Sequence, residues 1–153
     1  MKKTAFSLIE IVVVIVILAI LASIAILKFD SSFKQSSILK IKSDLVSIQT
    51  ALESSRNFNI VSLNNFAYPN ALDVCSPFDQ KCLLFGGIVG FEILKKPLAP
   101  CSADRENGCW EKQSDLQYLA WIDDSTSLVF EYDKTNGKFA CDTSNEICFE
   151  IMK

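Results

Sequence analysis

The residues best suited to chemistry in this chain are its acids and its cysteines, because it contains no histidine. Histidine is the commonest general base and the commonest transition-metal ligand, so its absence disfavours most acid–base and zinc sites. Asp123 and Asp124 form an adjacent carboxylate pair. Adjacent acids in a turn are ordinarily solvated, however, and acid–base catalysis needs a cleft. We therefore expect no catalytic residue and a protein that is not an enzyme.

Cation binding is a second use that the acids could have. Calcium accepts carboxylate and backbone oxygens as ligands. Four acids of this chain could contribute: Asp123, Asp124, Asp142 and Glu146. Their spacing does not match an EF-hand loop. We expect no cofactor and no metal ligand, with calcium as the less favoured alternative.

The cysteines form three near-neighbour pairs, with six or seven residues between the members of each pair: Cys75 and Cys82, Cys101 and Cys109, Cys141 and Cys148. These spacings are longer than those of zinc ligands or Cys-x-x-Cys redox motifs. An even number of cysteines in a small chain with an export signal is typical of disulfides in an oxidising compartment. Many connectivities are open, but neighbour pairing closes the shortest loops at the smallest entropic cost. Each bridge would stabilise the fold by roughly 2–3 kcal/mol.

Glu10 is the acid with the most unusual sequence position, because it lies inside the apolar run from Phe6 to Leu27. An acid near the middle of a membrane-spanning helix costs roughly 2.5–3.5 kcal/mol, and it costs less near the membrane edge. The run is long enough to cross a hydrocarbon core as a helix. Lys2 and Lys3 precede it and place the N-terminus in the cytoplasm. Glu10 therefore needs a partner and a function.

A cleaved secretory signal peptide is the alternative interpretation of this N-terminus. Its start is basic, and Ala19 and Ala22 offer small residues near a cleavage point. The apolar run is longer than the usual hydrophobic region of a signal peptide, and it contains Glu10. We favour a retained membrane anchor.

The N-terminus resembles the signal of type IV pilins and type II secretion pseudopilins. It reads Ala-Phe-Ser-Leu-Ile-Glu at residues 5–10, after a short basic leader and before an unbroken apolar helix. The resemblance implies that a prepilin peptidase cuts between Ala5 and Phe6 and methylates the new amine of Phe6. Glu10 then becomes the fifth residue of the mature chain, which this family uses in filament assembly.

The chain departs from the family pattern at three positions. Ala5 stands where glycine usually precedes the cut, although we still expect cleavage there. Many members have a glycine and a proline within the anchor, where this chain has Ala19 and Leu27. These two departures put in doubt the local unwinding of the anchor that some filaments of the family have.

The helix is expected to continue beyond the apolar run, since no glycine or proline interrupts it before Pro69. An apolar stripe recurs at spacings of three and four residues: Ile38, Ile41, Leu45, Ile48 and Leu52. We expect this stripe to pack on a small sheet and the helix to end near Asn57–Asn59. The following residues, to 108, are expected to form a connector, with a short helix over 81–94 and a turn at the glycines of 86–90.

The last third of the chain has the pattern of an antiparallel sheet. We expect strands over 116–122, 128–132 and 138–141, with a hairpin turn at Thr135-Asn136-Gly137 and a closing edge strand over 148–151. The predicted fold class is α+β: a long N-terminal helix, transmembrane in its first half, packed on a small antiparallel sheet and stapled by disulfides, as in pilins. The predicted domains are a leader (1–5), a transmembrane helix (6–28), its periplasmic half (29–56) and a globular head (57–153).

The resemblance implies a structural subunit of a type II secretion pseudopilus or a type IV pilus-related filament. Its partners would be the prepilin peptidase, other pilin subunits in a homo-oligomeric filament and the inner-membrane assembly platform. The subunit would span the bacterial inner membrane once, with its head in the periplasm, and its filament would lie in the periplasm or at the cell surface. A minor pilin of a DNA-uptake system and a simple tethered periplasmic protein are the alternatives. The net charge of −3 argues against direct contact with nucleic acid.

Overall fold

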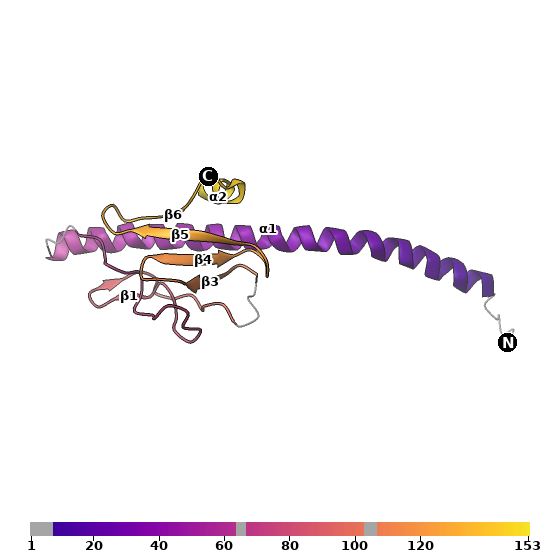
Figure 1. Cartoon of the computed structure of the whole chain (residues 1–153), viewed down its shortest axis with the longest axis horizontal. Coiled ribbons are helices and arrows are strands. Elements are labelled where there is room, and N and C mark those ends of the chain that lie inside the picture. The colour runs from indigo at the N-terminus through magenta and orange to yellow at the C-terminus, as the bar shows by residue number, and fades with distance from the viewer. Residues whose placement is uncertain (1–7, 64–66, 103–106) are drawn as a thin grey trace. The chain divides into compact units, whose positions relative to one another are not determined.

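Figure 1 shows a computed structural model of the chain, which describes residues 8–63, 67–102 and 107–153, apart from the side chains of 24–31, 59, 62 and 63. The chain divides into two compact units, Met1–Phe33 and Lys34–Lys153. The second unit contains the sheet, the disulfides and the hydrophobic core.

Helix α1 spans Leu8–Leu63 and contributes to both units. The expectation that it ends at Asn57–Asn59 is wrong, because the helix continues to Leu63. Asparagine lowers helix propensity by only a few tenths of a kcal/mol, and no glycine or proline follows until Pro69. The second unit therefore begins with a helix slightly longer than expected.

Four strands form an antiparallel sheet in the order β3-β4-β5-β6: β3 (Cys109–Lys112), β4 (Gln117–Trp121), β5 (Ser127–Asp133) and β6 (Lys138–Cys141). The strands predicted over 116–122, 128–132 and 138–141 are confirmed as β4, β5 and β6. Strand β3 was not predicted, because its polar residues Glu111 and Lys112 weaken the pattern of a short strand. It pairs with β4, with Lys112 opposite Tyr118.

The hairpin turn between β5 and β6 is confirmed. The Gly137 amide donates to the Asp133 carbonyl at 2.7 Å, and Gly137 has a positive φ of 74°. A Cβ atom at this position would overlap the Tyr68 ring. Both the backbone conformation and the close approach of Tyr68 therefore require glycine here.

A two-stranded hairpin replaces the short helix that was expected over 81–94. It consists of β1 (Gly87–Ile88) and β2 (Phe91–Glu92), paired antiparallel. Gly87 has a positive φ of 90°, and a Cβ there would overlap the Phe91 carbonyl oxygen. The glycines do form a turn, as predicted, and this turn prevents a helix.

The C-terminal residues form helix α2 (Glu146–Met152) and not the expected edge strand. The Asn145 side chain caps the helix by accepting from the backbone amides of Ile147, at 2.9 Å, and Cys148, at 3.3 Å. Cys148 and Ile151, three residues apart, are buried on one face of α2. The cap and this helical spacing explain why a strand does not form.

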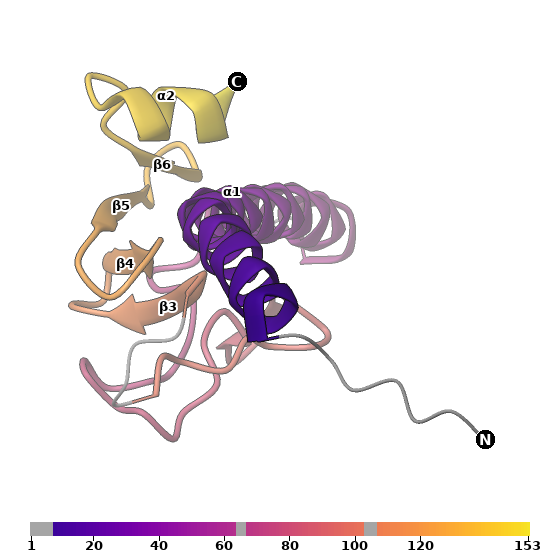
Figure 2. The ribbon, with the colours of Figure 1, turned by 90° about the vertical axis from the view of Figure 1, so that its right-hand side faces the viewer.

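The core lies between α1 and one face of the four-stranded sheet. Figure 2 shows the strands on one side of α1, with α2 beside β6. From α1 the predicted apolar stripe is buried at Ile41, Leu45, Ile48 and Leu52, and Ile38 packs at its margin. Five aromatic rings fill the space with centroid distances of 4.6–5.9 Å: Phe85, Trp110, Tyr118, Phe130 and Phe139. The α+β class and the disulfide-stapled antiparallel sheet are therefore confirmed.

Candidate functional site

Glu10 lies in the first turn of the described helix α1, and its side chain is exposed. The large apolar side chains around it are exposed as well, with exposed fractions of 41–81% between Leu8 and Leu21. An extended exposed apolar surface of this kind marks a site of contact with lipid or with other protein. Glu10 is the single acid among the described residues Leu8–Leu21, so it is the one carboxyl group that such a contact would remove from water.

The structure has three disulfides, and each joins neighbouring cysteines: Cys75–Cys82, Cys101–Cys109 and Cys141–Cys148. The Cα atoms of the pairs are 5.1–6.0 Å apart, which is ordinary disulfide geometry. The first bridge closes a loop before the β1–β2 hairpin, the second joins the start of β3 to the preceding segment, and the third joins β6 to α2. The first two bridges thus fasten segments that have little regular structure, and the third fastens the C-terminal helix to the sheet.

A buried polar cluster, which the sequence analysis missed, attaches the first disulfide loop to the sheet. Lys112 Nζ donates to Asp73 Oδ1 at 2.9 Å and to the Cys75 carbonyl at 2.7 Å. Asp73 Oδ2 accepts from the Tyr118 hydroxyl at 2.9 Å and from the Phe85 amide at 3.1 Å. Both side chains of the ion pair are 1% exposed. Lys112 lies two residues after Trp110, and residues two apart on a strand point to the same face of the sheet. This spacing was the only sequence signal that Lys112 faces the core.

The environment of this cluster favours a structural role. Burial raises the pKa of Tyr118 far above its ordinary value, and the neighbouring Asp73 carboxylate raises it further. The hydroxyl therefore stays protonated and donates to Asp73. Both oxygens of the Asp73 carboxylate have partners within the protein, so the cluster attaches the loop to the sheet.

The structure divides the four acids of the less favoured calcium alternative between two separate segments. Asp123 Oδ1 accepts from the Ser125 and Thr126 amides at 2.9 and 2.7 Å, and Asp123 Oδ2 lies 3.1 Å from Lys34 Nζ. Burial alone would raise the pKa of Asp123, but these hydrogen bonds and the ammonium outweigh it and lower the pKa. Asp142 lies in the turn before α2, where its carboxylate accepts from the Ser144 amide. Glu146 is the first residue of α2. In the part of the chain that the structure describes, no three such side chains form a group that could hold a metal ion.

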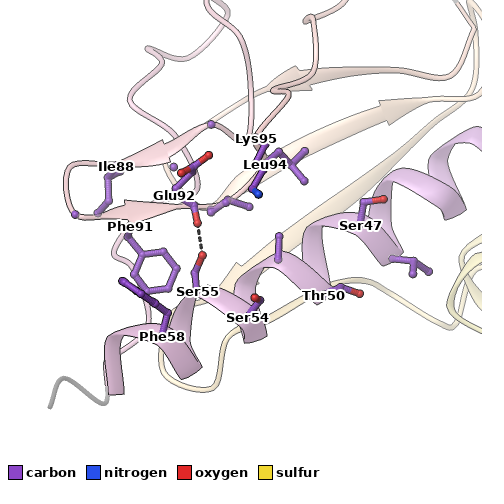
Figure 3. Close-up of a pocket in the computed structure, with 16 residues that line it drawn as sticks. Ser47, Thr50, Ser54, Ser55, Phe58, Ile88, Phe91, Glu92, Leu94 and Lys95 are labelled. Carbon is purple, nitrogen blue, oxygen red and sulfur yellow. Dashed lines mark hydrogen bonds between the residues drawn. The ribbon is translucent and has the colours of Figure 1, made fainter. Parts of the chain in front are cut away.

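An open groove of about 1090 Å³ runs between α1 and the β1–β2 hairpin. The helix wall includes Ser47, Thr50, Ser54 and Phe58, and residues 86–95 contribute the other wall, with Phe58 beside Phe91 (Figure 3). Ser55 Oγ donates to the Glu92 carbonyl and joins the two walls. Glu92 and Lys95 are the only charged residues of the lining, and the others are apolar, hydroxyl-bearing or glycine. No sequence signal pointed to this groove, because its two walls come from distant segments.

Residues 1–26 match a family model described as the prokaryotic N-terminal methylation motif. The chain carries the signature of type IV pilins and pseudopilins. No curated protein and no solved structure matches the chain. The matched residues include the first part of α1 and Glu10.

The pilin signature implies processing by a prepilin peptidase, assembly with other pilin subunits and anchoring in a membrane. Ala5 and Phe6, the predicted cleavage and methylation residues, lie outside the described residues, so their roles stay predictions. Over the part of the chain that the structure describes, we find no helix with both the length and the apolar content needed to cross a membrane.

Proposed function

We propose that the chain is a structural subunit of a pilin-like filament, either a type II secretion pseudopilus or a related type IV pilus, that serves protein secretion. It acts without a cofactor and is not an enzyme. It is anchored once in the bacterial inner membrane, with the N-terminus in the cytoplasm and the head in the periplasm. The observation that carries the proposal is Glu10, an acid within the methylation motif on a helix whose apolar side chains are exposed.

The proposed mechanism is charge pairing between subunits. After cleavage the amine of Phe6 is cationic near neutral pH, because the reference pKa of an α-amino group is about 7.7–8 and methylation keeps it basic. An amine and a carboxylate at an apolar boundary are each costly alone. Pairing the Phe6 amine of one subunit with Glu10 of another neutralises both charges and sets the axial register. The Leu, Ile and Val side chains of the helix supply most of the contact area.

A local account competes with this mechanism. Phe6 and Glu10 are four residues apart, so a single helix could pair its own amine and carboxylate. An acid near a helix N-terminus also interacts favourably with the helix dipole. Under this account Glu10 stabilises the helix of each subunit, and assembly does not depend on it.

Replacement of Glu10 by alanine separates the two accounts. On our proposal Glu10→Ala is inserted and cleaved normally, because the cut bond is unchanged, but it fails to enter filaments. The measurement is the fraction of subunit in sheared filaments, together with the mature N-terminus by mass spectrometry. Glu53→Ala is the matched control, since Glu53 is also an exposed acid of α1. In cells that also express wild type, the Glu10→Ala subunit should be under-represented in filaments. Equal incorporation of both would show a local helix role and refute the proposed mechanism.

Membership of a DNA-uptake filament is the second candidate, and it would use the same N-terminal pairing. The net charge of −3 argues against direct contact with phosphates but not against membership of such a filament.

A further inference from the structure

The helix–hairpin groove, formed by residues 46–58 of α1 and by residues 86–95, has the character of a docking surface. Phe58 and Val46 are 67% and 54% exposed at its helix wall. Glu92 and Lys95 are exposed on its other wall, and neither forms an ion pair with another residue that the structure describes. The groove thus offers apolar contact area flanked by one negative and one positive charge.

A second surface on the same unit has the complementary character. The loop of residues 74–83, here called the Phe78 loop, exposes three large apolar side chains: Val74, Phe78 and Leu83. Two exposed charges of opposite sign, Asp79 and Lys81, follow Phe78. The Phe78 loop therefore combines an apolar centre with one acid and one base, the same combination as the groove.

The Phe78 loop is held rigidly in a strained backbone conformation. Phe78 has a φ of +61°, in the left-handed region that non-glycine residues seldom adopt. The Cys75–Cys82 disulfide closes the loop, and the Phe78 amide donates to the Lys112 carbonyl at 2.9 Å. At the start of the loop, the Cys75 amide donates to the Asp73 carboxylate, and Lys112 Nζ donates to the Cys75 carbonyl. A loop closed in this way loses little conformational entropy on binding.

We infer that the helix–hairpin groove receives the Phe78 loop of a second copy of this chain. Phe78 contacts the exposed ring of Phe58 on the helix wall, while Lys81 faces Glu92 and Asp79 faces Lys95. Electrostatic complementarity of this kind fixes the register of an interface more than its affinity. The two surfaces are made by different residues, so each subunit would use its groove towards one neighbour and its loop towards another. Such a heterologous contact repeats from subunit to subunit, as a filament requires.

This inference rests on the proposed function, because a filament is what presents a second copy at a fixed position. It goes beyond that proposal by naming the two head surfaces that meet. The N-terminal pairing of Phe6 and Glu10 and the head contact involve separate residues and are tested separately.

Photo-crosslinking in assembled filaments tests the contact. The full chain carries p-benzoylphenylalanine at Phe58 and is assembled together with isotopically heavy wild-type subunits. We expect a dimer-sized adduct in which residue 58 of the unlabelled variant is joined to residues 76–81 of a heavy wild-type subunit. Fragmentation of the crosslinked peptides by mass spectrometry locates the site. The matched control carries the same group at Phe149, an exposed phenylalanine of α2 that lies outside both surfaces, and should give no adduct at residues 76–81.

Charge exchange tests the predicted register. We expect Glu92→Lys or Lys81→Glu alone to lower incorporation into filaments by about twofold to fivefold, as for single charges at the rim of an interface. The double variant, Glu92→Lys with Lys81→Glu, should return to within about twofold of wild type. Both residues are exposed, and unchanged unfolding temperatures of the variants would verify that the head stays folded.

The outcomes separate this inference from the proposed function. Filaments that form normally, with Phe58 adducts at other peptides or with none, overturn the docking contact and leave the filament proposal standing. A double variant no better than the singles also overturns it. A chain that forms no filament, alone or with partner subunits, overturns the proposed function and the docking contact with it.

Discussion

Lys112 and Asp73 form an ion pair that is removed from water almost completely. Two buried charges tolerate each other only while both are present and hydrogen-bonded. Their partners include Cys75, Phe85 and Tyr118, and Lys112 also lies 3.5 Å from the exposed carboxylate of Asp115, so the pair links the first disulfide loop to the aromatic core. The cluster therefore fixes the backbone of Cys75 at the start of the Phe78 loop.

Replacing Lys112 by methionine should destabilise the head by about 3–5 kcal/mol, because Asp73 would remain buried without its cation. Denaturant unfolding measures this loss. Lys138→Met, at an exposed lysine of β6, is the matched control and should change stability by less than about 0.5 kcal/mol. Adding Asp73→Asn to Lys112→Met should recover part of the loss. A Lys112→Met head as stable as the control would show that the pair contributes nothing.

Asp123 makes the stability of the head depend on pH. Its hydrogen bonds and Lys34 lower its pKa in the folded state below the ordinary value of 3.8. A carboxyl group with a lowered folded pKa contributes stability above its unfolded pKa, and this contribution is lost as pH falls through the folded pKa. The unfolding temperature of Asp123→Asn should therefore be lower than that of wild type at pH 7, with a smaller difference below about pH 4. A constant difference between pH 7 and pH 3 would contradict this account.

The elements of the head differ in how far the sequence alone specifies them. The α1 stripe and strands β4, β5 and β6 were predictable because their apolar spacing is local and regular. Helix α2 was not, because its seven residues also suit a strand, and the Asn145 cap decides the outcome. The β1–β2 hairpin depends on the positive φ of Gly87.

Contacts between distant segments were the part of the site that the sequence did not indicate. Lys112 and Asp73 are 39 residues apart, and the groove joins α1 to the β1–β2 hairpin. Contacts of this kind depend on tertiary packing between segments far apart in the sequence, and a local sequence pattern does not specify them. Glu10 was identifiable because an acid in an apolar run is conspicuous within one segment.

The Cys141–Cys148 bridge should matter most among the disulfides. It joins β6 to α2, so Cys141→Ser releases the C-terminal helix from the edge of the sheet. We expect a loss of roughly 2–3 kcal/mol, and a smaller loss for Cys75→Ser, whose loop the Asp73–Lys112 pair still holds. Unfolding of each variant measures these losses. Non-reducing peptide mapping of wild type should yield the three neighbour pairs, and a Cys82–Cys101 peptide would refute the pairing.

At the scale of the whole molecule, the two units have different parts in the proposed filament. The methylation motif and Glu10 belong to the first unit, and the groove and the Phe78 loop belong to the second. The first would supply the apolar contact area and the axial register. The second would supply the contact between heads, on a core closed by three disulfides that suits an oxidising compartment.

The N-terminal residue of the mature protein tests the central claim most directly, because only a pilin-type signal is cut before its apolar run. The measurement is the intact mass of the protein extracted from membranes. Our account predicts a chain that begins at Phe6, carries one added methyl group and contains three disulfides. A mature chain that begins near Ser23 or Ile26 would instead show an ordinary secretory signal peptide and contradict the assignment as a pilin-like subunit.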